Sequence, residues 1–279
     1  MKRLSKLMMA CIMAAIMMMT VGCQKEDIAP IIPDSPIVPD GVLPGLFSVS
    51  ATHQVHFSQG NLQYQASTNT WRFAEHQYDY VGSANHNISS TYSGWIDLFC
   101  WGTGNNPTLA STTYTDYSTF VDWGSNAIIN GGNAVHQWRT LTQSEWYYLL
   151  ISRTNASSKR GTGNINGVHG LIILPDSWTL PSGCPQFNPG FASNSGDWTL
   201  NSYTLAQWAQ MESAGAVFLP AAGGRYGTTV YNVGNYGNYW SSTPYNEDNA
   251  YDMSFYSSYL YATDGYKRYR GFSVRPVQD

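Results

Sequence analysis

The stretch LTQSEWYYLLIS, residues 141–152, predicts an amphipathic helix in the middle of the chain. Thr142 and Glu145 have the spacing of a capping box, in which each side chain accepts a hydrogen bond from the other residue's backbone N–H. Trp146, Leu149 and Leu150 then fall on one face, because helical residues three and four positions apart are neighbours. We therefore expect a helix to the end of this stretch, with one side packed against a core.

A second helix is predicted over residues 205–213. Its register is marked by Leu205, Trp208 and either Met211 or Glu212. Gly215 follows as a stop signal, because glycine readily adopts the left-handed conformation that ends helices.

Short strands are predicted on both sides of the two helices, from alternating apolar runs bounded by Gly, Asn and Ser. They lie at 47–49, 55–57 and 71–73 before the helices and at 239–242, 250–256, 259–261 and 271–277 after them. Between the helices, residues 161–167 are interpreted as a turn-rich loop and residues 171–175 as a short buried strand. Before the first helix, residues 94–132 are interpreted as long loops held by tryptophans. This order predicts an α+β fold, with two helices packed on an antiparallel sheet and long ordered loops.

The N-terminus predicts export. Three basic residues precede an uncharged apolar run, so residues 1–22 are interpreted as a signal peptide. The segment Thr20-Val21-Gly22-Cys23 resembles a lipobox, which implies that Cys23 is lipidated; the alternative is ordinary cleavage that leaves Cys23 free. Residues 23–45 are interpreted as the lipidated N-terminus and a proline-rich tether, and residues 46–279 as one domain.

Residues 24–27 (QKED) resemble the charged signal that sends lipoproteins of Bacteroidetes-type bacteria to the cell exterior. The expected location is therefore the outer membrane, with the protein lipid-anchored and facing outward. The lipid is the only expected contact with the membrane.

The composition disfavours acidic partners. Removing residues 1–22 leaves 11 of the 14 Lys and Arg and all 18 Asp and Glu, so the mature charge is 11 − 18 = −7. Nucleic acid is therefore excluded as an expected partner. Outside the N-terminal region only Cys100 and Cys184 remain, and the sequence leaves open whether they form a disulfide.

Six segments carry a family resemblance, and they cover nearly the whole body. They are similar to those of a large Bacteroides and Prevotella surface lipoprotein family related to the Fibrobacter succinogenes major paralogous domain. The segments are 60–64 (GNLQY), 95–99 (WIDLF), 141–146 (LTQSEW), 170–175 (GLIILP), 239–242 (YWSS) and 271–277 (GFSVRPV).

The resemblance implies a C-type-lectin-like fold, of the kind found in formylglycine-generating enzymes. It also implies a relation to the variable ligand-binding proteins of diversity-generating retroelements. The family usually has glycine where this chain has Cys100.

Signatures of catalysis are missing from the sequence. It has no G-x-S-x-G or H-E-x-x-H motif, and its six histidines are scattered. Cys100 and Cys184 do not lie in the late segment where formylglycine-generating enzymes keep their redox pair, and the motifs of calcium-binding lectins are absent. We expect no enzyme activity, no metal and no cofactor; a degenerate enzyme of the formylglycine-generating type is the weaker alternative.

A tyrosine-rich segment, residues 226–270, is the predicted ligand-binding region, because tyrosine with Asn, Ser and Asp is typical of antibody paratopes. Met253 and Phe255 are expected to face the core while Tyr256 and its neighbours face outward; in the alternative interpretation tyrosine only suits strands and low-charge surfaces. The predicted ligand-binding residues are Tyr231, Asn232, Tyr236, Asn238, Tyr245, Asn246, Asp248, Asn249, Asp252, Ser254, Tyr256, Tyr259, Tyr261 and Tyr266.

The expected function is therefore recognition or adhesion at the cell surface, with an unidentified protein or glycan ligand on another cell or surface. The residue types also fit adenine-directed diversification by a retroelement. The alternative is a structural or adhesive subunit of a surface appendage.

Replacing the predicted lipidation site, Cys23→Ser, should abolish membrane attachment, because acyl chains supply about 0.8 kcal/mol per buried CH₂. Cell fractionation followed by a high-salt wash measures this. A substituted protein that still sediments with membranes would contradict the lipoprotein interpretation.

Overall fold

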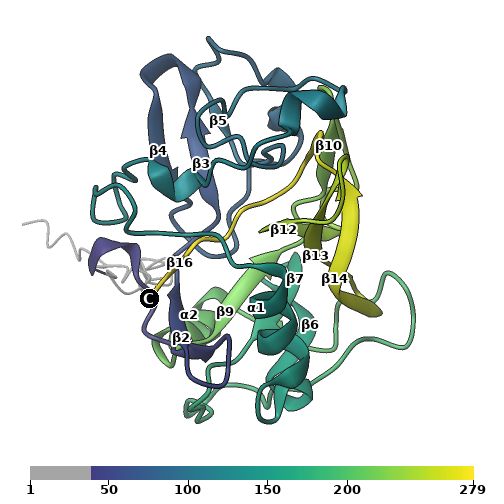
Figure 1. Ribbon diagram of the computed structural model, residues 1–279. Coiled ribbons are helices and arrows are strands. Elements are labelled where there is room, and N and C mark those ends of the chain that lie inside the picture. The colour runs from purple at the N-terminus through teal and green to yellow at the C-terminus, as the bar shows by residue number, and fades with distance from the viewer. Residues whose placement is uncertain (1–38) are drawn as a thin grey trace, which may run out of the picture. The chain divides into compact units, whose positions relative to one another are not determined.

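The computed structural model describes residues 39–279 (Figure 1), so the predicted signal peptide, Cys23 and most of the predicted tether lie outside the described residues. The elements before the first helix are β1 (Phe47–Ser48), β2 (Gln54–Phe57), β3 (Leu62–Gln65), β4 (Thr70–Phe73) and β5 (Trp95–Ile96). The middle of the chain contains α1 (Gln143–Tyr147), β6 (Arg160–Ile165), β7 (Val168–Ile173), β8 (Ser202–Tyr203), α2 (Leu205–Ser213) and β9 (Val217–Pro220). The last elements are β10 (Gly224–Tyr226), β11 (Thr229–Tyr231), β12 (Gly237–Pro244), β13 (Asn249–Tyr256), β14 (Tyr259–Lys267), β15 (Arg270–Gly271) and β16 (Val277–Gln278).

The predicted α+β class is confirmed, but the expectation of one antiparallel sheet is wrong. In the described region the strands form five small sheets, ordered β1-β2-β16, β4-β3-β5, β8-β6-β7-β9, β11-β10-β15 and β12-β13-β14. All ladders are antiparallel except β6 with β8. Short strands interrupted by long loops leave each sheet too small to span the domain.

Both predicted helices are present. At α1 the Glu145 backbone N–H donates to Thr142 Oγ1 (3.2 Å) and the Thr142 N–H donates to Glu145 Oε2 (2.8 Å), which confirms the capping box. The helix continues as a π-helical turn over Tyr148–Ser152. The α2 helix has the predicted bounds and is followed by Gly215 in the left-handed region, with φ of 97°.

The glycine-rich segment 161–167, predicted to be a turn-rich loop, is instead strand β6 and its hairpin turn into β7. The glycines permit close packing against a neighbouring chain segment. A Cβ on Gly163 would lie 2.3 Å from the carbonyl oxygen of Asn201. Packing against β8 therefore outweighs the weak strand propensity of glycine.

The C-terminal segment 271–277, predicted to be one strand, is broken. Only β15 and β16 are regular, and between them single bridges join Phe272 to Phe99 and Ser273 to Tyr239. The two sides of this segment do not differ in burial. Ser273 and Arg275 on one side are buried, and so is Phe272 on the other. Figure 1 shows this segment in yellow crossing between the other elements before β16 pairs with β2.

The hydrophobic core includes residues that precede the predicted domain boundary at Leu46. Leu43 is fully buried, and its backbone N–H donates to the carbonyl oxygen of Phe57 (2.9 Å). The predicted end of the tether at Gly45 is therefore wrong, since residues from about Gly41 pack into the domain.

The sequence left open whether Cys100 and Cys184 form a disulfide, and in the structure both are free. The thiol of Cys100 contacts the carbonyl oxygen of Tyr269 (3.2 Å), whereas that of Cys184 contacts the carbonyl oxygen of Gln207 in α2 (3.5 Å). Within the described part of the chain, neither helix has the length and hydropathy that a membrane crossing requires.

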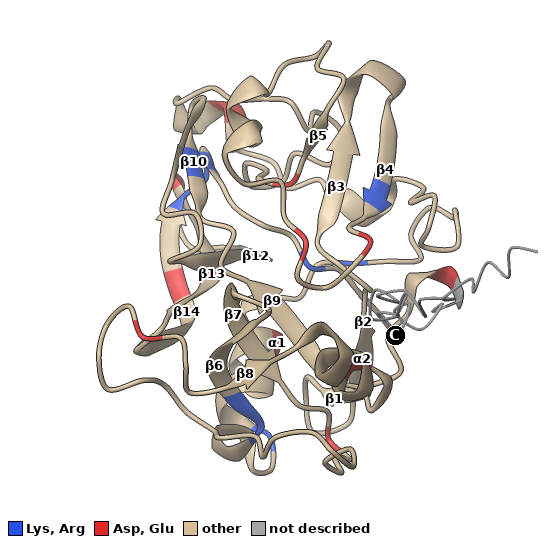
Figure 2. Ribbon diagram, turned by 180° about the vertical axis from the view of Figure 1, so that it is seen from behind, with Lys and Arg blue, Asp and Glu red and all other residues tan. Residues whose placement is uncertain are grey.

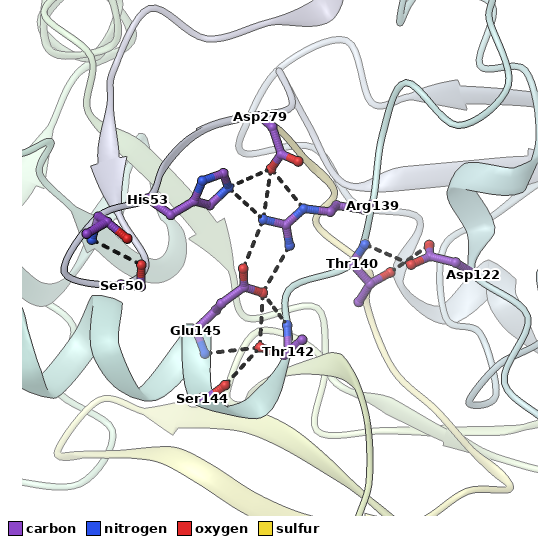
Figure 3. Close-up of polar contacts among 10 residues, drawn as sticks. Ser50, His53, Asp122, Arg139, Thr140, Thr142, Ser144, Glu145 and Asp279 are labelled. Atoms are coloured by element: carbon purple, nitrogen blue, oxygen red, sulfur yellow. Dashed lines mark hydrogen bonds and ion pairs between the residues drawn. The ribbon is translucent and has the colours of Figure 1, made fainter.

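Arg139 ties Asp279 to the first turn of α1 (Figure 3). Its guanidinium donates to both oxygens of Glu145 (2.9 Å each) and to Asp279 Oδ1 (2.9 Å), and His53 Nε2 lies 3.0 Å from the same Asp279 oxygen. The capping carboxylate of Glu145 is thereby shared between the helix and the end of β16. These contacts place α1 relative to the sheet β1-β2-β16.

A second polar centre lies at Asp176. Its carboxylate accepts hydrogen bonds from Ser48, Gln54 and the buried Arg153 (3.0 Å). Burial alone would raise the pKa of Asp176, but these hydrogen bonds lower it below its usual value.

Asp176→Ala should lower the free energy of unfolding by about 3 kcal/mol, because it leaves the Arg153 charge buried without its partner. Since the folded pKa is lowered, the wild type keeps this stabilisation above about pH 4 and loses it as the pH falls further. Denaturant unfolding at pH 7 and pH 3 measures both effects. The matched control is Asp197→Ala, an exposed carboxylate bonded only to nearby Thr199; equal losses in the two variants would contradict the assignment.

Candidate functional site

Strand β13 has two different faces, as the sequence predicts. Met253 and Phe255 are fully buried in the same cluster as Trp146 and Leu149 of the α1 helix and its π-helical turn. Tyr256, of opposite parity, is partly exposed. The α1 side of the sheet β12-β13-β14 is therefore a packing face. On the other side Ala250 and Asp252 are buried as well, and β13 becomes partly exposed only at Tyr256.

Four tyrosines cluster on the side opposite α1, and we call them the tyrosine face: Tyr236, Tyr256, Tyr259 and Tyr261. Tyr256 and Tyr259 are direct partners across the β13–β14 ladder, so they lie on the same side of the sheet. Adjacent ring centroids are 5.2 Å (Tyr236 to Tyr256), 5.9 Å (Tyr256 to Tyr259) and 4.4 Å (Tyr259 to Tyr261) apart. Three of the four rings are strongly exposed, at 39% for Tyr236, 45% for Tyr259 and 44% for Tyr261.

Two carboxyl groups lie on the same side of the sheet, next to the tyrosine face. Asp252 pairs with Asp264 across the ladder, two positions along β13 from Ser254, which pairs with Tyr261. Ser254 Oγ donates to Asp264 Oδ2 (3.1 Å). Asp252 is 1% exposed and neither of its carboxyl oxygens has a hydrogen-bond partner. We call Asp252 and Asp264 the acid pair.

Burial, and after it the charge of Asp264, raises the pKa of Asp252 well above its usual range. A charged carboxylate is expensive to bury without a partner, and two neighbouring carboxylates do not readily ionise together. The Asp252 carboxyl therefore keeps its proton to a higher pH than an exposed aspartate does.

Three predicted ligand contacts are buried. Asn238 and Ser254, at 6% and 7% exposure, pair with each other across β12 and β13, and Asp252 is covered as described above. The prediction that these three residues reach the surface is wrong, because they lie in the middle of the sheet, which is covered on both sides.

Tyr231 and Tyr266 border the acid pair. Burial raises the pKa of both phenols, the charge of Arg270 lowers both, and Asp252 when ionised raises both, which places the two rings near this carboxyl and near Arg270. Arg270 extends the group, with its guanidinium 4.5 Å from the ring centre of Tyr226 and 5.4 Å from that of Tyr231. The face therefore continues from exposed rings, over two carboxyl groups, to an arginine held among rings.

The other predicted contacts belong to turns. Asn246 Oδ1 accepts hydrogen bonds from the backbone N–H groups of Asp248 and Asn249, which shapes the β12–β13 hairpin, and Asp248 forms an ion pair with Lys267. Asn232 adopts a left-handed conformation with φ of 55° in the turn before β12.

A separate cavity of about 730 Å³ lies beside this hairpin. Tyr245 and Asn246, both predicted contacts, line it together with Tyr114, Glu247 and Arg268. Tyr245 packs edge-on against Tyr251, which has the parity of Met253 and not that of the acid pair. The predicted residues are thus divided between two places.

Sequence reasoning missed Asp264 and Arg270. A register shift between Asp252 and Ser254 brings Asp264, three positions after Tyr261, to the same side as Tyr261. Period-two alternation counted along β14 places Asp264 on the wrong face, so the signal was not readable from the sequence. Within residues 39–279, no group of three or more His, Cys, Asp or Glu side chains could hold a metal ion.

A family model described as a domain of unknown function (DUF8237) matches residues 197–277. The matched region includes α2 and all three strands of the sheet that carries the tyrosine face. No curated protein and no solved structure matches the chain.

Asp252→Asn should raise the melting temperature at pH 7 by at least roughly 2 °C. The folded pKa of this acid is raised, so the folded state holds a proton that the unfolded state releases, and stability falls as pH rises above about 4. Asparagine resembles the neutral acid and does not titrate, so the gain should shrink towards pH 4. Thermal melts from pH 4 to 7, with Glu247→Gln as an exposed control, measure this. A lower melting temperature at pH 7 would show instead that Asp252 is ionised and paired.

Proposed function

We propose that this protein is a surface recognition module that binds a protein or glycan ligand through the tyrosine face. The observation that carries the proposal is a contiguous set of exposed rings that pack on one another while the core is completed on the opposite side of the same strands. Clustered exposed aromatic side chains on a folded domain are typical of binding sites.

The chemistry of tyrosine supports this function. Each ring offers a large contact area with only two rotatable side-chain bonds, and each hydroxyl can donate or accept a hydrogen bond. The rings stand on paired strands, so their positions are set before a ligand arrives. Preorganised contacts lose less conformational entropy on binding.

We also propose a C-type-lectin-like fold for residues 39–279, and outward display from the outer membrane through lipid on Cys23. The two short helices, the small sheets and the long loops between β5 and α1 are consistent with the resemblance that suggested this fold. The membrane location is supported by the sequence of residues 1–27.

Diversification of segment 226–270 is part of the same proposal. The DNA that flanks the gene tests it, since a reverse transcriptase and a near-copy of this segment must both be present.

The double substitution Tyr256→Ala/Tyr259→Ala should weaken ligand binding about thirtyfold or more, because central aromatic anchors commonly contribute 2 kcal/mol or more. The melting temperature should change little, since exposed substitutions usually cost within about 0.5 kcal/mol. Binding of the full chain to host cells, neighbouring bacteria and a glycan array, alongside thermal melts, provides the measurement.

The matched control is Tyr114→Ala/Tyr147→Ala, which removes two equally exposed rings outside the tyrosine face. Retained binding in the Tyr256/Tyr259 variant, with loss in the control, would move the site to the cavity beside Tyr114. A large fall in melting temperature would show that Tyr256 and Tyr259 are needed for packing.

A further inference from the structure

The acid pair has no cationic partner among the described residues, although three basic residues follow it closely in the chain. Lys267 pairs with Asp248. Arg268 is buried and donates to backbone carbonyl oxygens, including that of Asn246 (2.6 Å). Arg270 lies over tyrosine rings and forms no ion pair with either acid. Neither acid therefore forms an ion pair with a described residue, although Arg270 lies close to Tyr231 and Tyr266, which border the acid pair.

The acid pair lies within paired strands and not in a loop. Figure 2 shows acidic positions within the β13–β14 pair, in the middle of the strands and not at their solvated ends. Asp252 is buried with both oxygens unpartnered, and Asp264, which pairs with it across the ladder, is only partly covered. Buried polar groups nearly always have partners, so a carboxyl with both oxygens unpartnered needs a physical explanation.

We propose that the ligand is a polypeptide that places an arginine or lysine side chain on the acid pair, between Tyr261 and Tyr266. This inference rests on the proposed function of the tyrosine face and names the chemical class of its ligand.

The geometry of Asp264 leaves room for such a contact. Its Oδ1 accepts from the Gly265 backbone N–H (2.9 Å) and its Oδ2 accepts from Ser254 Oγ (3.1 Å). A carboxylate offers about four acceptor positions, so two remain for a guanidinium or ammonium group. The hydrogen bonds from Gly265 and Ser254 also fix the orientation of the carboxylate before the ligand arrives.

The tyrosines complete the recognition of a cation. Tyr261 and Tyr266 are 44% and 40% exposed, and the charge of Asp264 raises the pKa of both phenols in addition to the effect of burial, which places the rings beside this acid. A cation within about 6 Å of an aromatic ring centre is attracted by the ring. Arginine suits this setting better than lysine, because its planar group stacks on rings and bonds carboxylates with two parallel hydrogen bonds.

The buried Asp252 strengthens the preference of this site for a cation. Burial beside Asp264 raises its pKa, and a bound cation would lower that pKa again by favouring the ionised form. The charge of Asp264 repels anionic ligand groups.

The test uses uniformly ¹⁵N-labelled full chain, with ¹³C-labelled tyrosine rings, and two capped tripeptides as probes: acetyl-Gly-Arg-Gly-amide and its neutral citrulline analogue. The arginine peptide should shift the ring signals of Tyr261 and Tyr266 and bind at least about tenfold more tightly than the citrulline peptide, a difference of 1.4 kcal/mol. Asp264→Asn should remove this preference. Asp252→Asn, which resembles the neutral acid and keeps the fold, should reduce it.

The control variant is Asp248→Asn, an acid of the neighbouring hairpin that pairs with Lys267, and it should bind like the wild type. Equal binding of the two peptides, no shift with either, or an arginine preference that survives Asp264→Asn overturns the proposal. Calcium chloride is a third probe: shifts of the same rings with calcium but not with the arginine peptide would identify a metal site instead.

Failure here is distinguishable from failure of the recognition function. If Tyr256→Ala/Tyr259→Ala still loses binding to cells or glycans while the arginine peptide shows no preference, the tyrosine face binds ligand without using the acid pair. If neither experiment shows an effect, both proposals are wrong.

Discussion

One fully buried cation, Arg275, joins the segments on which the rest of the structure depends. Its guanidinium donates to Gln77 Oε1 (2.8 Å), and the Gln77 amide donates in turn to Glu212 of α2 (3.0 Å). The same Gln77 oxygen accepts from the backbone N–H of Phe218 at β9 (2.7 Å). Burial lowers the pKa of Arg275 to about 10, so it remains charged at neutral pH. A buried charge needs hydrogen-bond partners, and although Arg275 Nε has none, the contact with Gln77 restricts how these four segments can pack.

This constraint extends to the tyrosine face through the backbone. The C-terminal segment that carries Arg275 also hydrogen-bonds β12, where the Ser273 N–H donates to the Asn238 carbonyl (3.0 Å) and the Trp240 N–H donates to that of Ser273 (3.1 Å). Strand β12 pairs with β13, and β13 with β14. The tyrosine face is therefore built on strands anchored at the centre of the domain, and rigid support of this kind favours precise placement of binding side chains.

Two buried acids, Asp97 and Asp252, differ in their hydrogen bonds. Asp97 accepts hydrogen bonds from Val81 (2.7 Å) and Asn85 (2.8 Å), and although burial raises its pKa to about 6 it has a clear structural role in holding a loop. Asp252 is equally buried but has no such contact. A buried carboxyl without hydrogen bonds lowers stability, and local conflicts of this type are expected at functional sites. Of the two acids, the one in the sheet, and not the one that holds a loop, lacks hydrogen-bond partners.

The sequence by itself determined the features that depend on nearby residues. Both helices follow from capping signals and apolar spacing, and the inward direction of Met253 and Phe255 follows from strand alternation, because these patterns act over a few positions. Only the tertiary structure decided the rest. The β6 glycines form a strand because β8 packs closely on them, and Leu43 belongs to the core because β2 lies beside it. Asp264 faces Asp252 because a one-residue register shift reverses the alternation of β14. Such shifts are set by packing between strands that are distant in space or paired irregularly, and no local pattern records them.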